Sequence, residues 1–102
     1  MERTADEPIN DVIRRTRVRR GLTQTALAEQ LAEASRNASV KRDQVARWER
    51  GGRVPSPYWR QWLAEVLGVP LDQLDWAARR ARAVRLLATD VSFQGPERFR
   101  AV

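Results

Sequence analysis

The sequence of 102 residues contains no cysteine and no histidine. These two absences exclude disulfide bonds, thiol catalysis, imidazole bases and the usual ligand sets for zinc and iron. No apolar run is long enough to span a membrane, and the N-terminal stretch "MERTADEPIN" lacks the hydrophobic core of a signal peptide. There is also no nucleophile with a partner base, and no pair of carboxylates beside a glycine-rich loop. We therefore expect a cytoplasmic protein that is not an enzyme and that uses no metal or cofactor.

Positive charge is abundant instead, and it is unevenly distributed. The net charge is +6, and 18 of the 19 basic residues are arginine. A GC-rich genome would explain arginine in place of lysine, but it would not explain where the charge lies. Residues 12–60 hold twelve basic and four acidic side chains, whereas residues 1–11 have a net charge of −3 and residues 61–102 of +1. Such a concentration favours a polyanionic partner, because neutralising phosphates releases their counterions.

Apolar residues recur at helical spacing along most of the chain, and strand-like alternation is nearly absent. Thr23 and Ser56 are suited to cap the N-termini of helices, and Gly21 and Gly68 are suited to end them. The pattern predicts five helices, at about 8–20, 23–35, 40–50, 57–67 and 70–88. We therefore expect an all-α domain in which the second and third helices form a helix-turn-helix pair. Its core should include three tryptophans, Trp48, Trp59 and Trp62.

Three stretches carry a family pattern in the right order. They are "RRGLTQTALAEQLA" (19–32), "QVARWERGGRVPS" (44–56) and "LAEVLGVPLDQL" (63–74). Over about residues 9–75 the chain resembles the DNA-binding domain of lambda-type phage repressors and Cro, the XRE family. The resemblance implies a five-helix fold and a bacterial or phage-like transcription regulator such as a repressor. Such a regulator binds double-stranded DNA with the helix at about 40–50 in the major groove, usually as a homodimer on an inverted repeat.

The connection between the second and third helices departs from the family pattern. Gln24 and Glu49 are 25 positions apart, several more than is usual, so the second helix is longer, the turn is longer, or both. The usual hydroxyl residue at the start of the third helix is replaced by Lys41, and we expect Ser39 to cap this helix instead.

The resemblance and the residue types together predict a set of contacts. Arginine donates twice to guanine and aspartate accepts from cytosine N4, so we expect side chains at the exposed side of the third helix to read bases. The alternative for each of them is an ordinary solvated surface residue. The predicted base-reading residues are Arg42, Asp43 and Arg47, and the predicted phosphate contacts are Gln24, Lys41, Arg53, Arg19 and Arg20. The family pattern also implies a structural salt bridge between Arg17 and Glu49, with a solvated Glu49 as the alternative.

The chain is expected to divide into an N-terminal arm (1–8), the helix-turn-helix domain (9–75) and a C-terminal helix extension with a short tail (76–102). This last part is a candidate surface for a homodimer or for a protein partner. An alternative function is therefore a protein-binding module, such as an antitoxin that acts through its C-terminal segment. The candidate surface residues are Trp76, Leu86, Leu87 and Phe93.

Overall fold

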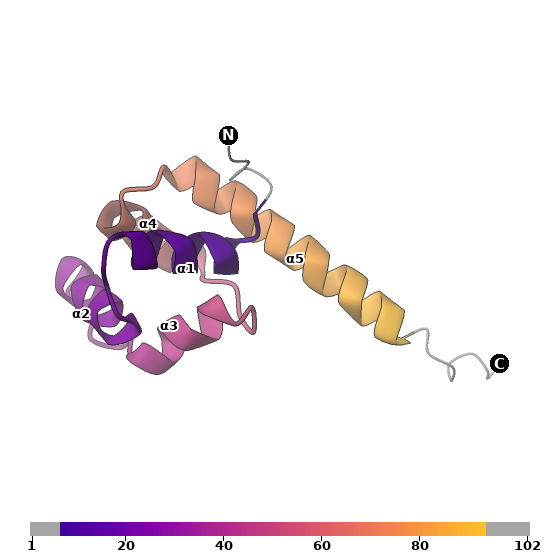
Figure 1. Ribbon diagram of the computed structural model, residues 1–102, viewed down its shortest axis with the longest axis horizontal. Helices are drawn as coiled ribbons and strands as arrows, with labels where there is room; N and C mark the ends of the chain where they lie inside the picture. The colour runs from indigo at the N-terminus through magenta and orange to yellow at the C-terminus, as the bar shows by residue number, and fades with distance from the viewer. Residues whose placement is uncertain (1–6, 94–102) are drawn as a thin grey trace.

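The computed structural model describes the backbone of residues 7–93 and the side chains of residues 7–83. Within these residues the chain forms five α-helices and no strand, so the predicted all-α class is confirmed (Figure 1). The helices are α1 (Ile9–Arg19), α2 (Gln24–Ser35), α3 (Arg42–Glu49), α4 (Pro57–Leu67) and α5 (Leu71–Phe93).

Local signals set several of the helix boundaries. The hydroxyl of Thr23 accepts a hydrogen bond from the N–H of Ala26 at 2.9 Å, and this satisfies one free donor of the first turn of α2. Ser56 caps α4 in the same way by accepting from the N–H of Trp59 at 3.4 Å. Gly68 ends α4 with a φ of 71°, a left-handed conformation that glycine adopts without steric cost. The caps predicted at these three residues are confirmed.

The start of α3 differs from the prediction. The helix begins at Arg42, two residues later than expected, because Val40 is buried in the core in a non-helical segment. Lys41 takes the capping position without a side-chain hydrogen bond, so the expected cap from Ser39 is wrong. The backbone N–H of Ser39 instead donates to the side chain of Asn37 at 3.0 Å, within the turn that precedes the helix.

Six residues, 36–41, connect α2 and α3, and α2 ends at Ser35 as predicted. Arg36 follows the helix with a φ of 58°, an uncommon left-handed conformation for a residue with a side chain. The amide of Asn37 donates to the hydroxyl of Tyr58 at 3.4 Å, which ties this connection to α4. The extended sequence between the two helices therefore forms an anchored turn.

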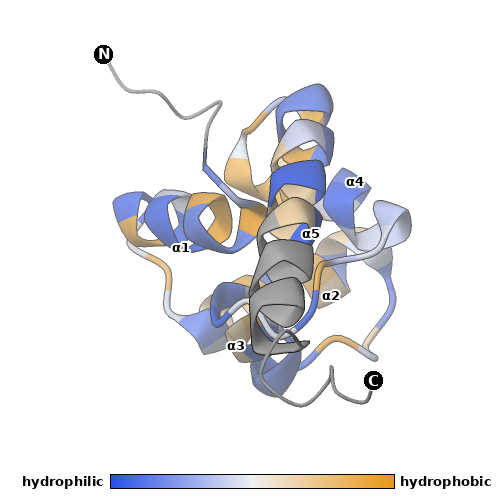
Figure 2. Ribbon diagram, turned by 90° about the vertical axis from the view of Figure 1, so that its right-hand side faces the viewer, coloured by the Kyte–Doolittle hydropathy of each residue, from blue (hydrophilic) through white to orange (hydrophobic). Residues whose placement is uncertain are grey.

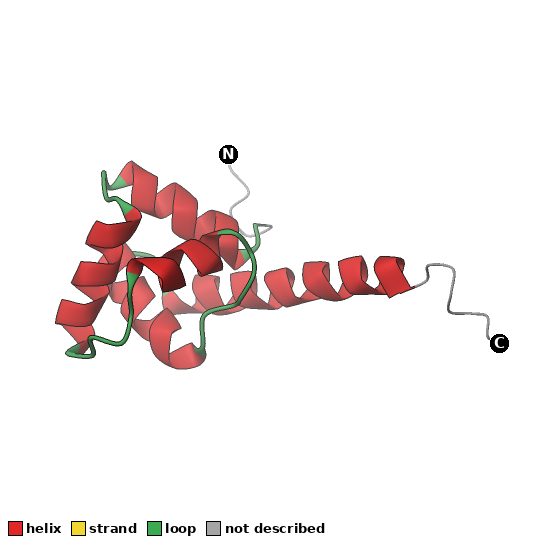
Figure 3. Ribbon diagram, turned by 90° about the horizontal axis from the view of Figure 1, so that it is seen from below, coloured by secondary structure: helices red, strands yellow, loops and turns green. Residues whose placement is uncertain are grey.

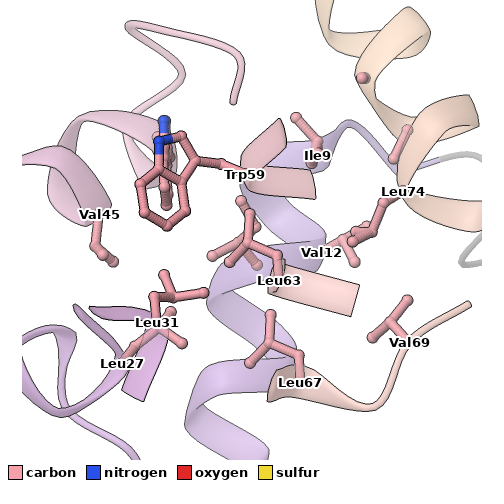
Figure 4. Close-up of a cluster of buried hydrophobic side chains, with 14 of the residues drawn as sticks. Ile9, Val12, Leu27, Leu31, Val45, Trp59, Leu63, Leu67, Val69 and Leu74 are labelled. Atoms are coloured by element: carbon pink, nitrogen blue, oxygen red, sulfur yellow. The ribbon is translucent and has the colours of Figure 1, made fainter. Parts of the chain in front are cut away.

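The core lies where all five helices meet (Figure 4). Trp48 of α3 is buried, and its ring centroid lies 6.3 Å from that of Trp59 in α4. Trp62, expected in the core, is only partly buried against its edge. Most of the remaining buried side chains are aliphatic, and the largest of them are Ile9, Ile13, Leu27, Leu31, Leu63 and Leu74.

The fifth helix is longer than predicted. It continues to Phe93 rather than ending near Ala88, because no glycine or proline lies between Pro70 and Gly95 and adding residues to an existing helix costs little free energy. Its first half lies against α1 and α4, and its core contacts reach Ala81 (Figure 2). Its second half extends past the other four helices (Figure 3). Nowhere in the described residues is a helix both long enough and apolar enough for a membrane span.

Candidate nucleic-acid interface

One side of α3 is fixed to the core and the other is open to solvent. Val45 and Trp48 are fully buried, whereas Arg42, Asp43 and Arg47 are exposed. Since residues four positions apart share a helix face, Asp43 and Arg47 lie one turn apart on the open side. The packing of the aromatic side chain thus leaves a polar helix face available for a ligand.

The charge on and around this open side is strongly positive. Asp43 is its only exposed acid between residues 41 and 53, and it lies 3.5 Å from a guanidinium nitrogen of Arg42. The exposed basic side chains in the same range are Lys41, Arg42, Arg47, Arg50 and Arg53. Such a surface attracts a polyanion and repels other cations.

A buried ion pair joins α1 to the inner side of α3. The Nε of Arg17 donates to Oε2 of Glu49 at 2.6 Å, and its Nη2 donates to Oε1 at 2.9 Å. The third nitrogen, Nη1, donates to the carbonyl oxygen of Leu22 at 2.8 Å. The hydrogen bonds to Glu49 raise the pKa of Arg17 above its ordinary value; burial opposes them, and the negative charge of Glu49 adds to them. Arg17 therefore stays charged and holds Glu49 in one orientation.

Gln24, the first residue of α2, extends this pair towards the surface. Its Nε2 donates to Oε1 of Glu49 at 3.1 Å, and its Oε1 accepts from Nη1 of Arg42 at 3.5 Å. One amide hydrogen of Gln24 is thus used by the buried carboxylate, which leaves the second for another acceptor. The side chain was predicted as a phosphate contact, and its role as a bridge between Glu49 and Arg42 was not predicted.

The chain turns sharply after α3. Gly51 has a φ of 79°, and the N–H of Gly52 donates back to the carbonyl oxygen of Arg47 at 3.0 Å. Arg53 follows this turn and is exposed. Together with Arg47 it lines a hollow between α3 and the start of α4. The predicted phosphate contact at Arg53 therefore lies beside the open side of α3.

Arg19 and Arg20 lie elsewhere. They line a separate hollow with Arg15, against the turn between α4 and α5, and no residue of α3 contributes to it. The guanidinium of Arg20 extends over Gly68, with its Nη1 3.4 Å from the point where a Cβ of that glycine would be. The structure therefore does not bring these two predicted phosphate contacts together with the exposed side of α3.

The start of α5, where the helix-turn-helix domain meets the C-terminal segment, presents two exposed apolar side chains. Leu71 is 39% exposed and Trp76 is 45% exposed, both on the first turns of α5. The guanidinium carbon of Arg79 lies 5.5 Å from the centroid of the Trp76 ring, in a cation–π arrangement. The side chains of three further candidates, Leu86, Leu87 and Phe93, lie outside the described residues.

A second buried arginine was missed by sequence reasoning. The Nε of Arg60 in α4 donates to Oδ1 of Asp75 in α5 at 2.8 Å, and its Nη1 donates to the carbonyl oxygen of Pro55 at 2.8 Å. These contacts hold α5 and the segment before α4 against each other. Nothing in the local spacing marks Arg60, because it is one of many arginines and its partner is fifteen positions away.

The comparison with known protein families agrees with this geometry. The sequence model of one family, described as "Helix-turn-helix domain", matches residues 11–77 and so covers α2, α3 and the exposed side of α3. Neither the curated proteins nor the solved structures compared with the chain gave a match. The matched region is more than half of the chain, and the match is consistent with the predicted resemblance to an XRE-like DNA-binding domain. The chain belongs to the helix-turn-helix domain family.

Proposed function

We propose that this protein is a sequence-specific transcription regulator that places α3 in the major groove of double-stranded DNA. The observation that carries this proposal is the two-sided environment of α3. Trp48 anchors one side in the core, while the other side is exposed and rich in arginine. A helix of this kind fits the wide major groove, where base edges present distinct donor and acceptor patterns.

The residues at the start of α3 are the proposed base readers. Arg42 has a second partner in Gln24, whose amide limits the directions that the guanidinium takes. A guanidinium held in this way donates twice to the O6 and N7 of guanine, and Asp43 accepts from the N4 of cytosine. This arrangement gives the site a preference for particular base pairs.

The proposed phosphate contacts surround this helix. Lys41 and Arg53 are exposed at its two ends, and Gln24 has one amide hydrogen to donate. Contacts of this type set affinity and register rather than sequence preference. Arg19 and Arg20 stay predictions from the sequence, since they line a different hollow.

The second half of α5 supports a homodimer. This segment extends past the other four helices of the chain. A second copy of the chain packed against it would cover the helix and place two α3 helices on one side of the DNA. The preferred target is then an inverted repeat with half-sites about 34 Å apart.

Selection of bound fragments from random duplex DNA tests this function. We expect enrichment of an inverted repeat, an affinity that falls steeply with salt, and sedimentation of two protein chains per duplex. Failure to enrich any duplex, with the protein shown to be folded by circular dichroism, would contradict the proposal.

The exposed apolar side chains of Leu71 and Trp76 favour a second candidate function. In this case the C-terminal segment binds a protein partner, as an antitoxin does, and the helix-turn-helix domain serves autoregulation. Replacing Trp76 with serine would then abolish the biological effect while DNA affinity survives. Loss of both together would argue against this second function.

A further inference from the structure

A polar hollow lies between α3 and the start of α4. Two apolar rings, Trp48 and Trp59, form part of its wall. Its polar lining residues are Gln44, Arg47, Arg53 and Ser56. The sequence predicts Arg47 as a base reader and Arg53 as a phosphate contact, yet in the structure both residues line the same hollow.

The stem of Arg47 lies against Gly52, in the turn after α3. Its Cγ lies only 3.4 Å from the point where a side chain at Gly52 would begin, so glycine at this position leaves room for the stem. The N–H of Gly52 also donates to the carbonyl oxygen of Arg47. The turn after α3 therefore folds back over Arg47, at the end of the helix that lies away from Arg42.

Two arginines line this hollow, and none of its lining residues is acidic. Within the described residues, neither Arg47 nor Arg53 has an ion-pair partner, and the nearest exposed acid in sequence, Asp43, lies beside Arg42. Like charges brought together repel unless an anion neutralises them. The positive end of the α4 dipole adds to the same potential. An anion with several oxygen acceptors, such as a phosphate group, satisfies both arginines at once.

We infer that this hollow holds one backbone phosphate of the DNA, gripped by Arg47 and Arg53 together, and that Arg47 is a phosphate contact rather than a base reader. This inference rests on the proposed function, and it assigns sequence preference to the first turn of α3 alone. Arg42 and Asp43 then read bases, while the end of the helix fixes the register of the DNA backbone.

Replacing Arg47 with lysine distinguishes a phosphate contact from a base contact. A phosphate accepts a lysine ammonium as a point charge, whereas bidentate recognition of guanine depends on the planar fork of arginine. Substitution by lysine therefore separates a backbone contact from base reading, while substitution by alanine removes both.

The test compares binding of the selected duplex and of a shuffled duplex by Arg47→Ala, Arg53→Ala and Arg47→Lys variants. We expect each alanine variant to bind both duplexes more weakly by the same factor. The double variant Arg47→Ala/Arg53→Ala should lose about eightfold in affinity at ~0.1 M salt and lower the salt slope by about one, the effect of one phosphate no longer neutralised. The ratio between the two duplexes should stay unchanged, and Arg47→Lys should restore most of the affinity. Arg14→Ala, which removes an exposed charge of α1, is the matched control for net charge.

Neutral methylphosphonate linkages, placed one at a time along the half-site, complete the experiment. One position should abolish the effect of both alanine substitutions, because both arginines contact the same phosphate. An Arg47→Ala variant that loses preference but keeps affinity for the shuffled duplex would overturn this inference and leave the proposed function standing. Equal binding of all duplexes by the wild-type protein would overturn both. Binding of inorganic phosphate alone at Arg47 and Arg53, below millimolar concentration, would show that the hollow is a site for a free anion. That result would also overturn the inference.

Discussion

Two arginine–carboxylate pairs involve α3, and their surroundings differ sharply. Arg17 and Glu49 are 13% and 4% exposed and lie 2.6 Å apart, whereas Arg42 and Asp43 are 56% and 87% exposed and lie 3.5 Å apart. The first pair joins residues 32 positions apart and crosses from α1 to α3, while the second joins sequence neighbours. The same chemical groups thus organise the fold on the inner side of the helix and remain available to a ligand on the outer side.

The two pairs differ in what they contribute to stability. An exposed ion pair contributes about 0–1 kcal/mol, because water and salt screen it. Removing one partner of a buried pair costs about 3–5 kcal/mol, because the other charge is left without compensation. The three predictions below are ordered by their expected effect on the free energy of unfolding.

Replacing Glu49 with glutamine should have the largest effect. The substitution keeps the shape of the side chain but leaves the charge of Arg17 without its partner, so we expect a loss of about 3 kcal/mol. For a domain of this size, that loss lowers the midpoint of thermal unfolding by roughly 12–24 °C. Calorimetry or circular dichroism measures the change. A Glu49→Gln midpoint equal to that of the wild type would show that the inner pair is no more important than the outer one.

Replacing Arg60 with methionine should have an intermediate effect. Methionine keeps much of the side-chain length, but it loses the bonds to Asp75 and to the carbonyl oxygen of Pro55. Because Asp75 is partly exposed, its share of the pair is screened, and we expect a loss of about 1–2 kcal/mol. Hydrogen exchange should become faster in the first turns of α5. Arg80→Met, at an exposed position of α5, is the control and should change stability by less than about 0.5 kcal/mol.

Replacing Arg42 with alanine should have the smallest effect on stability, within about 0.5 kcal/mol, because the pair with Asp43 is exposed. The effect should instead fall on DNA recognition, with a loss of about 1–3 kcal/mol of preference at one base pair. Binding competition between the selected duplex and single-base variants measures it. If Arg42→Ala instead lowered the unfolding temperature as much as Glu49→Gln does and left the base preference unchanged, the two pairs would not differ in their roles.

The elements that the sequence predicted well depend on neighbouring residues. Thr23 and Ser56 cap helices because their hydroxyls reach N–H groups three positions along the chain, and Gly68 ends α4 by its own conformation. The sequence predicts the end of α5 too early, since the residues after Ala88 show no apolar stripe. A formed helix continues without such a stripe until a breaking residue intervenes.

Contacts between distant segments were harder to predict. Gln24 bridges Glu49 and Arg42 only because α2 and α3 meet at one angle, and residue spacing does not contain that angle. The same is true of the hollow that holds Arg47 and Arg53, since it forms where the turn after α3 meets the start of α4. Eighteen arginines offer many combinations, and only the relative placement of helices selects among them.

The uninterrupted course of α5 has a mechanical consequence. The helix runs from the core contact of Ala81 to Phe93 without a break, a reach of about 18 Å at 1.5 Å per residue. A body joined to its far end would be held by a rod rather than by a flexible tether. If two chains meet through these rods, the distance between their recognition helices is fixed by the helices themselves. Inserting or deleting a single base pair between half-sites should then misalign the second copy by about a tenth of a helical turn.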